Sequence, residues 1–378
     1  MSGDDRFEVL VYPEMGDGVS THAHKFIESS PDGLDLVLKE VPHVQTAIDL
    51  LLDGHGDVVP VSGEWWYNNR HKDLSSLLVL PRREPTRVLV GEDKPEYIPK
   101  GGIILADCEV IKRQLLRSRS DVQVLLVEEF GDAPDDVFDR VVWLEGLRKD
   151  GSIDGFVTTR ALHSTLPSRA RRHTLGIQRQ DDSRSRFVPI PLEGYTILLT
   201  RKDFPSSRFS KVIDSGASLS LRIEIMILDS IEPEMHDKIA LVVEQRKVRT
   251  ILQDVGNRGR TLGSENPLTE WKSFTVKDEK QGPKDSDPRI DIILETLSKD
   301  GTVTTSVERI FPIEESHSGA QNVLFNWQQL LKIARETPEE EKRGRMKQIM
   351  DDYIDDLVSK GRLSDDRIYS PLFKDGDY

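Results

Sequence analysis

The sequence predicts an α/β protein with two lobes built on mixed, mostly parallel sheets, followed by a small α+β third domain and a helical C-terminal extension. Three observations support this fold class: the chain length, the apolar content, and the alternation of short apolar runs with helical stretches. A chain of 378 residues is too long for one ordinary core and indicates two or three domains. Its 37% of hydrophobic residues suffices for packed cores, and strand–helix alternation is typical of βαβ units with parallel strands.

The first lobe is expected to comprise residues 1–98 and 195–213. Each predicted strand is a short apolar run bounded by turn-forming residues, which is the pattern of a buried strand. The predicted strands are residues 7–11, 34–41, 57–61, 74–80 and 86–90, and residues 195–200 return the chain to this lobe.

The second lobe is expected to comprise residues 99–194 and repeats the alternation before an arginine-rich stretch. Its predicted strands are residues 103–106, 122–127 and 153–158, and its predicted helices are residues 108–118 and 135–148. The arginine-rich stretch contains Arg160, Arg169, Arg171, Arg172, Arg179, Arg184 and Arg186. It is either a solvated loop that offsets the acidic surface or a site for carboxylates or phosphates.

The pattern changes in the third domain, which is expected to comprise residues 214–313. A helix at residues 219–228 and a strand at residues 238–243 precede a polar insertion near residues 245–288. The insertion is rich in Gly, Pro, Asp and Lys, a composition that predicts loops. Lys299-Asp300-Gly301 between two apolar runs is the strongest hairpin signal in the chain.

The C-terminal extension is expected to comprise residues 314–378 and to be helical. Residues 322–335 carry an apolar stripe at helical spacing. Thr337, Pro338 and Glu340 supply the N-cap, first-turn proline and glutamate of a further helix start. Such helices either pack on the rest of the chain or bind a protein partner.

Charge and cysteine content exclude several classes of function. The net charge of −14 repels phosphate backbones, so no nucleic-acid partner is expected. The N-terminus is acidic, and no apolar run approaches the ~20 residues that span a bilayer, so we expect no membrane association and a cytoplasmic location. The single cysteine, Cys108, excludes an intrachain disulfide and a cysteine-based metal site, and no metal site is expected.

Several segments follow one another in the order, and at about the distances, found in one enzyme family. They are residues 57–62, 81–90, 99–104, 112–116, 121–124, 147–159, 192–195 and 298–307, and Pro81-Arg82-Arg83-Glu84-Pro85 is similar to the family's Pro-Arg-Glu-Asp-Pro stretch. Together they resemble hydroxymethylbilane synthase (porphobilinogen deaminase) over residues 7–313. The resemblance implies two periplasmic-binding-protein-like lobes with a third domain, a role in or near tetrapyrrole (porphyrin) biosynthesis, and a transferase reaction if the chain is active.

The sequence departs from this family at the residues that carry its chemistry. Trp65 falls in the place of the family's essential aspartate, and an indole cannot stabilise a developing cation as a carboxylate does. Residues 231–236 occupy the region of the family's cofactor-anchoring cysteine and contain none. We therefore expect a degenerate active site without dipyrromethane or any other cofactor and without porphobilinogen polymerisation, and no catalytic residue is assigned.

The candidate ligand-binding residues follow predicted strands, where open α/β sheets place their ligands. They are Ser62, Glu64, Trp65, Trp66, Asp107, Cys108, Glu129 and Arg160. A polycarboxylate would be repelled by Asp107, Glu128 and Glu129, so a neutral or cationic planar ligand in an inter-lobe cleft is expected.

Three readings of the aromatic group and two alternative functions stay open. The aromatic group Trp65-Trp66-Tyr67 is a stacking platform for a planar ligand, a plug that fills an abandoned pocket, or a patch under the neighbouring lobe. Besides a divergent member of the enzyme family, the chain can be a non-catalytic two-lobed small-molecule-binding protein or an interaction scaffold.

Overall fold

A computed structural model describes residues 6–29, 34–166, 170–179, 185–205, 209, 213–261, 284–336, 353 and 359–360. The chain divides into two compact units, Met1–Trp327 and Gln328–Tyr378, with the boundary inside the helix at Ser316–Glu336. In the described part of the chain, no helix has the length and apolar character needed to cross a membrane.

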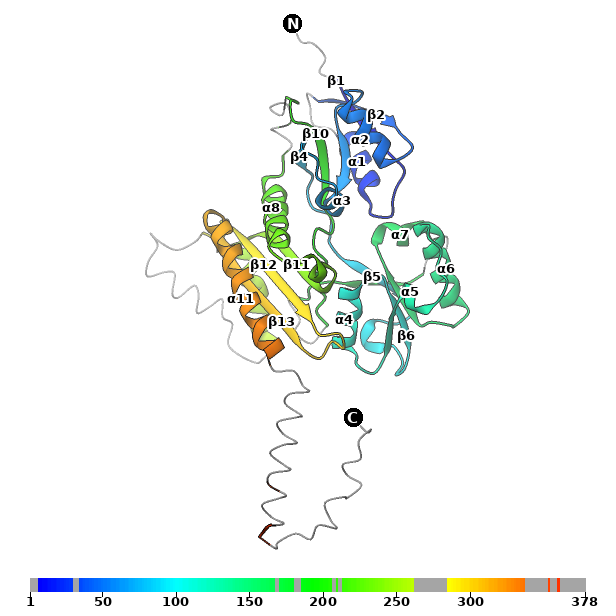
Figure 1. Ribbon diagram of the computed structural model, residues 1–378, viewed down its shortest axis with the longest axis vertical. Coiled ribbons are helices and arrows are strands. Elements are labelled where there is room, and N and C mark those ends of the chain that lie inside the picture. Colours follow the sequence, from blue (N-terminus) through cyan, green and yellow to red (C-terminus); the bar gives the residue numbers. More distant parts are fainter. Residues whose placement is uncertain are drawn as a thin grey trace. The chain divides into compact units, whose positions relative to one another are not determined.

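The first lobe contains two small sheets that share one core. Its elements are β1 (Arg6–Val11), α1 (Val19–Glu28), β2 (Asp35–Glu40), α2 (Val44–Leu52), β3 (Val59–Ser62), α3 (Gly63–Asn68), β4 (Leu74–Val79) and β10 (Thr196–Arg201). β1 and β2 are parallel, and a parallel bridge joins Val9 to Val58, next to β3. β10 lies antiparallel between β3 and β4, so the chain returns to this lobe late in the sequence, as its green colour among blue elements shows (Figure 1).

The second lobe is a five-stranded sheet with helices packed on it. Its elements are β5 (Arg87–Gly91), η1 (Pro95–Tyr97), β6 (Ile103–Ala106), α4 (Glu109–Ser118), β7 (Gln123–Leu126), α5 (Val127–Phe130), α6 (Val137–Lys149), β8 (Gly155–Thr158), α7 (Arg160–Thr165) and β9 (Arg172–Leu175). The strand order is β7-β6-β8-β5-β9. β6 is parallel to β7 and β8, whereas β5 is antiparallel to β8 and β9.

The strand at residues 86–90 was expected in the first lobe, but β5 pairs with β8 and β9 of the second lobe's sheet. The reason is burial on both faces: Val88 and Val90 pack into one apolar cluster and Leu89 into the cluster on the other side. The expectation of mostly parallel sheets is also wrong. Of the seven strand pairings described in the two lobes, three are parallel and four antiparallel, because β5 and β10 both run against their neighbours.

The third part is an antiparallel sheet with helices. Its elements are α8 (Ser215–Asp229), η3 (Pro233–Lys238), β11 (Ile239–Lys247), α9 (Val248–Thr261), β12 (Pro288–Leu297), β13 (Thr304–Pro312), η4 (Ile313–Glu315) and α11 (Ser316–Glu336). The hairpin expected at Asp300 joins β12 to β13, and Gly301 adopts φ 73° there. The polar insertion near residues 245–288 is not all loop, because β11 extends to Lys247 and α9 follows it; residues 262–283 lie outside the described residues.

Other expectations also fall outside the described residues. They are Arg169 and Arg184 of the arginine-rich stretch and the helix start at residues 337–340. Of the C-terminal extension, η4 and α11 are described, and α11 begins at Ser316, six residues before the apolar stripe that predicted it.

Two connecting segments, residues 80–86 and 188–195, join the lobes and contact each other. The Leu80 N–H donates to the Thr196 carbonyl at 3.0 Å, and the Arg83 N–H donates to the Gly194 carbonyl at 3.1 Å. The second segment also contacts the third part, because the Leu241 N–H of β11 donates to the Pro189 carbonyl at 3.0 Å. The connection between the lobes therefore lies against the third part of the chain.

Candidate functional site

A pocket of about 330 Å³ lies where elements of both lobes, a connecting segment and the third part meet. Its wall is contributed by α3, the start of α4, the second connecting segment, α8 and η3. The lining residues are Glu64, Tyr67, Asn68, Cys108, Val110, Ile190, Pro191, Leu192, Leu228, His236 and Asp237. Aliphatic and aromatic side chains make up most of this wall, with carboxylates from two different elements.

Helix α3 decides which of the residues after β3 face the pocket. The Ser62 hydroxyl accepts a hydrogen bond from the Trp65 N–H at 3.1 Å and caps the helix. Residues three and four apart share a helix face, so Tyr67 and Asn68 lie beside Glu64 in the pocket wall. Trp65 and Trp66 are half-buried and are not among the lining residues. No helix was predicted here, so Asn68 was missed, whereas Tyr67 belongs to the aromatic group predicted as a stacking platform and is the member of that group that lines the pocket.

The Tyr67 ring is held between two side chains. It makes an edge contact with the His236 ring at 5.8 Å between centroids, and the Arg70 guanidinium lies 4.8 Å above it. Nε2 of His236 lies 3.1 Å from the Leu228 carbonyl and 3.0 Å from the Ile231 carbonyl. These contacts fix an aromatic wall of the pocket without any bound ligand.

Cys108 lies in the pocket wall as the residue before α4. Burial, and after it the Asp107 carboxylate, raises the pKa of the Cys108 thiol well above its usual range. The thiol is therefore protonated at neutral pH and is a poor nucleophile. Its contribution to the pocket is that of a small apolar surface.

Asp107 is neutralised by Arg87, the first residue of β5. Arg87 Nη1 lies 2.7 Å from Asp107 Oδ2, and Arg87 Nη2 lies 3.0 Å from Glu193 Oε2. Burial works against the charge of Arg87, but the two carboxylates outweigh it and raise the pKa of the guanidinium. Asp107 does not line the pocket, so it offers a ligand there neither contact nor uncompensated charge.

Two carboxylates do line the pocket. Among the described residues Glu64, which is exposed, makes no hydrogen bond or ion pair. Asp237 Oδ1 lies 3.6 Å from the Lys238 ammonium, a long and exposed pair. The pocket thus presents negative charge at its polar edge.

Two further candidates are engaged elsewhere. Glu129 accepts from Lys112 at 2.7 Å and from the Leu126 N–H at 2.8 Å. Arg160 is paired with the Glu84 carboxylate at 2.9 Å. It also donates to the hydroxyls of Thr86 at 3.1 Å and Thr174 at 2.9 Å. Neither side chain lines the pocket, and both have structural partners.

The loop after β1 meets α7 and not the pocket. The Thr159 hydroxyl donates to the Gly16 carbonyl at 2.6 Å, and Arg83 donates to the Asp17 carbonyl. Burial raises the pKa of Asp17 to about 6. Burial and the charges of Arg83 and Lys25 lower the pKa of His22 to about 4. The candidate residues expected around one cleft are thus distributed: only Glu64 and Cys108 of the eight line the pocket.

The remaining pocket residues come from segments with no local signal of a binding site. Val110, Leu192 and Leu228 are apolar residues like any in a core, and Asp237 lies in a 3-10 helix. Within the described part of the chain, no three His, Cys, Asp or Glu side chains are placed to hold one metal ion.

Comparison with solved structures finds neighbours of low sequence identity and low TM-score, which show neither a family nor a function. No family model matches the sequence, and no curated protein matches it. The methionine binding protein MetQ is 13% identical, covering 59% of this chain and 96% of that chain, with a TM-score of 0.32. The periplasmic aliphatic sulphonate binding protein SsuA from Escherichia coli is 12% identical, covering 88% of this chain and 94% of that chain, with a TM-score of 0.32. The chain is an α/β protein with periplasmic-binding-protein-like structural neighbours.

Proposed function

We propose that the protein binds a small, largely apolar molecule with a cationic or hydrogen-bond-donating group in the pocket lined by Tyr67 and Leu192. The observation that carries this proposal is the composition of the wall. Its surface is mainly aliphatic and aromatic, while Glu64 and Asp237 place carboxylates at its edge. The nearby cation Arg87 is already neutralised by two carboxylates, so it does not attract an anion.

The volume and the contacts set the class of ligand. About 330 Å³ lies at the lower end of the range of small-molecule sites and suits one or two fused rings. Apolar area supplies the affinity, whereas a few polar groups fix orientation. An amine beside Glu64 would gain a charge-assisted hydrogen bond, and a carboxylate there would be repelled.

Binding without catalysis accounts for the side chains at the site. The Cys108 thiol stays protonated, and Nε2 of His236 already lies within hydrogen-bond distance of two backbone carbonyls. Trp65 stands where the resemblance to hydroxymethylbilane synthase would require an aspartate. A tetrapyrrole-related activity rests on the sequence resemblance alone, and binding is the better supported proposal.

A matched set of probes tests the charge preference. 1-Naphthylmethylamine, 1-naphthalenemethanol and 1-naphthoate share one ring system and differ in charge, and their affinities are measured by calorimetry at low salt. The amine should bind best and the carboxylate worst. Tighter binding of the naphthoate than of the amine would contradict the proposal.

Three variants locate the site. Glu64→Gln should weaken the amine up to about fivefold, because an exposed charge contributes up to about 1 kcal/mol. Asn68→Trp should fill the pocket from an exposed position and abolish binding of all three probes. Glu28→Gln, an exposed residue of α1, is the matched control and should change nothing.

A further inference from the structure

We propose that Glu224 of α8 is the positioning residue of this pocket. It holds Leu192 in the backbone conformation that forms one wall, and it ties both connecting segments to the third part of the chain. The inference rests on the proposed binding function in naming the pocket, but its central test needs no ligand. It assigns to the third part control over the shape of the site.

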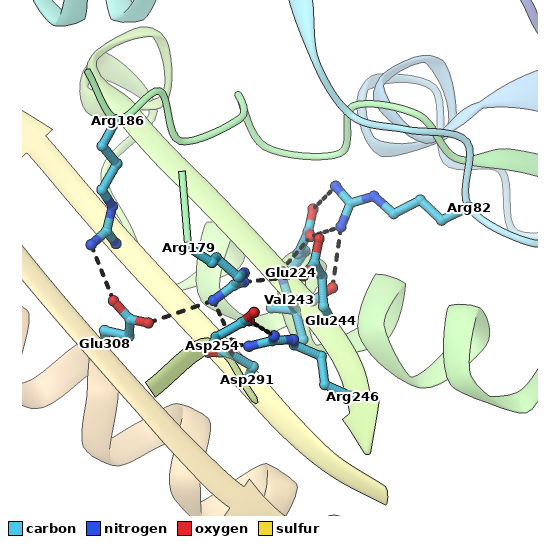
Figure 2. A network of polar contacts seen from close by, with 10 residues as sticks. All are labelled: Arg82, Arg179, Arg186, Glu224, Val243, Glu244, Arg246, Asp254, Asp291 and Glu308. Atoms are coloured by element: carbon cyan, nitrogen blue, oxygen red, sulfur yellow. Dashed lines mark hydrogen bonds and ion pairs between the residues drawn. The ribbon is translucent and has the colours of Figure 1, made fainter. Parts of the chain in front are cut away.

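Glu224 is fully buried and accepts hydrogen bonds from three parts of the chain. Arg82 Nη1 donates to Oε1 at 2.7 Å, and the Val243 N–H donates to the same oxygen at 2.9 Å. The Leu192 N–H donates to Oε2 at 2.8 Å. The Tyr195 hydroxyl lies 3.3 Å from Oε1. Both oxygens are thus used, and Figure 2 shows Arg82 reaching this carboxylate beside Val243.

Three of the four donors, all except Val243 of β11, belong to the segments that join the lobes. Arg82 lies in the first connecting segment, and Leu192 and Tyr195 lie in or next to the second. Arg82 also donates to the Glu193 carbonyl at 2.9 Å and to the Val243 carbonyl at 3.1 Å, and it lies 4.1 Å above the Tyr195 ring. The Arg82–Glu224 ion pair therefore contacts both connecting segments and strand β11.

Leu192 adopts a backbone conformation that is unfavourable for a residue with a branched side chain. Its φ is 63°, in the left-handed region that side chains with a Cβ rarely occupy. The N–H of Leu192 is the donor to Glu224, so the carboxylate compensates for this strain. Two residues later Gly194 has φ 82°, and a Cβ there would lie 2.7 Å from the Arg83 carbonyl oxygen. The second segment thus turns tightly against the first at this point.

The same turn forms part of the pocket. Leu192 lines the pocket directly, and Leu228, one helical turn after Glu224, lines it from α8. The Leu228 carbonyl oxygen lies 3.1 Å from Nε2 of His236, which also lines the pocket. A change in how Glu224 holds Leu192 must therefore move a wall of the pocket and the connection between the lobes together.

Asp291, in the third part of the chain, is a matched control for Glu224. Asp291 of β12 is also fully buried and pairs with Arg246 at 3.0 Å and with Arg179 at 2.7 Å (Figure 2). Arg179 follows β9, and neither Arg179 nor Arg246 lies in the connecting segments at residues 80–86 and 188–195. Asp291→Asn removes a buried charge as Glu224→Gln does, at a different place.

Amide hydrogen exchange of the full chain tests the proposal without a ligand. Glu224→Gln should speed exchange of the Leu192 amide at least tenfold, whereas Asp291→Asn should leave that amide unchanged. Arg82→Lys keeps the charge and loses part of the hydrogen bonding, so it should give a smaller increase at the same amide if Glu224→Gln does not fold. Unchanged Leu192 exchange in the Glu224→Gln and Arg82→Lys variants would overturn the proposal, as would an equal increase in Asp291→Asn.

A distance measurement tests the link to the lobes. Spin labels at Asp53→Cys and Ser152→Cys, both exposed, in a Cys108→Ser background report the separation of the two lobes. Glu224→Gln should broaden the distance distribution, and Asp291→Asn should not. If none of the naphthalene probes binds, the binding function fails while exchange and distances still decide the role of Glu224. If probes bind and Glu224→Gln leaves exchange, distances and affinity unchanged, the positioning role fails alone.

Discussion

Arg87 and Asp107 form an ion pair with 2.7 Å between Nη1 and Oδ2, and this pair neutralises a carboxylate that was expected to repel an anionic ligand. Asp107, Glu128 and Glu129 were expected to repel an anionic ligand. Each is paired: Asp107 with Arg87, Glu128 with Arg140 at 3.7 Å and Glu129 with Lys112 at 2.7 Å. The negative charge at the pocket comes instead from Glu64 and Asp237.

Asp107→Asn should destabilise the protein by about 1–3 kcal/mol, because it removes one of the two carboxylates that compensate the buried guanidinium of Arg87. Urea unfolding monitored by tryptophan fluorescence measures the change. The exposed pair of Glu128 with Arg140 is the control, and Glu128→Gln should change the free energy of unfolding by less than about 0.5 kcal/mol. Equal effects of the two variants would show that the Arg87 pair contributes no more than a surface pair.

Tyr67→Ala should lower affinity for 1-naphthylmethylamine about tenfold or more, because it removes the aromatic wall that makes an edge contact with His236. Trp66→Ala, the next residue back on α3, should leave that affinity within about twofold, since Trp66 does not line the pocket. Calorimetry of both variants gives the comparison. Loss of binding in Trp66→Ala alone would restore the tryptophans as the ligand platform.

His22 should make the protein less stable as pH falls. Its pKa is lowered from 6.5 to about 4 in the folded protein, first by burial, so the folded state resists taking up a proton that the unfolded chain accepts. Its stabilising contribution is therefore present above pH 6.5 and lost as pH falls toward 4. Because His22 is partly exposed, we expect a loss of about 1–2 kcal/mol after allowing for solvent screening.

His22→Asn removes this loss while keeping a polar atom near the Thr196 hydroxyl, which lies 3.0 Å from Nδ1 of His22. Urea unfolding from pH 7.5 to 4.5 should show that the variant gains stability relative to the wild type as pH falls. The raised pKa of Asp17 acts in the opposite sense in this window, but it is common to both proteins and cancels in the difference. Parallel stability curves for the two proteins would contradict the shifted pKa of His22.

Porphobilinogen should not be converted to hydroxymethylbilane by this protein, because Trp65 stands where the resemblance would require the aspartate, and the sole cysteine, Cys108, is a partly buried, protonated thiol outside residues 231–236. Incubation with porphobilinogen, followed by optical detection of oxidised products, measures turnover. Intact mass checks for a covalently attached dipyrromethane. Turnover at ~1 s⁻¹ or faster would refute the prediction, since that lies within the ordinary range of enzymes.

Several features of the fold depend on local sequence and were predictable from it. The apolar run at residues 57–61 predicts the strand found as β3, and Asp300-Gly301 predicts the hairpin of β12 and β13. Both signals are local: an apolar run bounded by turn formers favours a strand, and a glycine accepts the positive φ of a tight turn. Helix α3 was missed because Ser62 caps it directly after a strand, and only the cap reveals a helix as short as six residues.

The site itself was decided by tertiary structure. β5 has the sequence of a buried strand, but no local feature of that sequence predicts that it pairs with β8 and β9. Likewise Glu64, Leu192 and Asp237 share a pocket only because the connecting segments bring the three parts together. The sequence by itself determined many of the strands and helices, such as β3 and the β12–β13 hairpin, since backbone preference and apolar spacing act over a few residues. Which charges are paired and which side chains face one space depended on contacts between segments distant in the chain, and those follow from burying all the apolar faces at once.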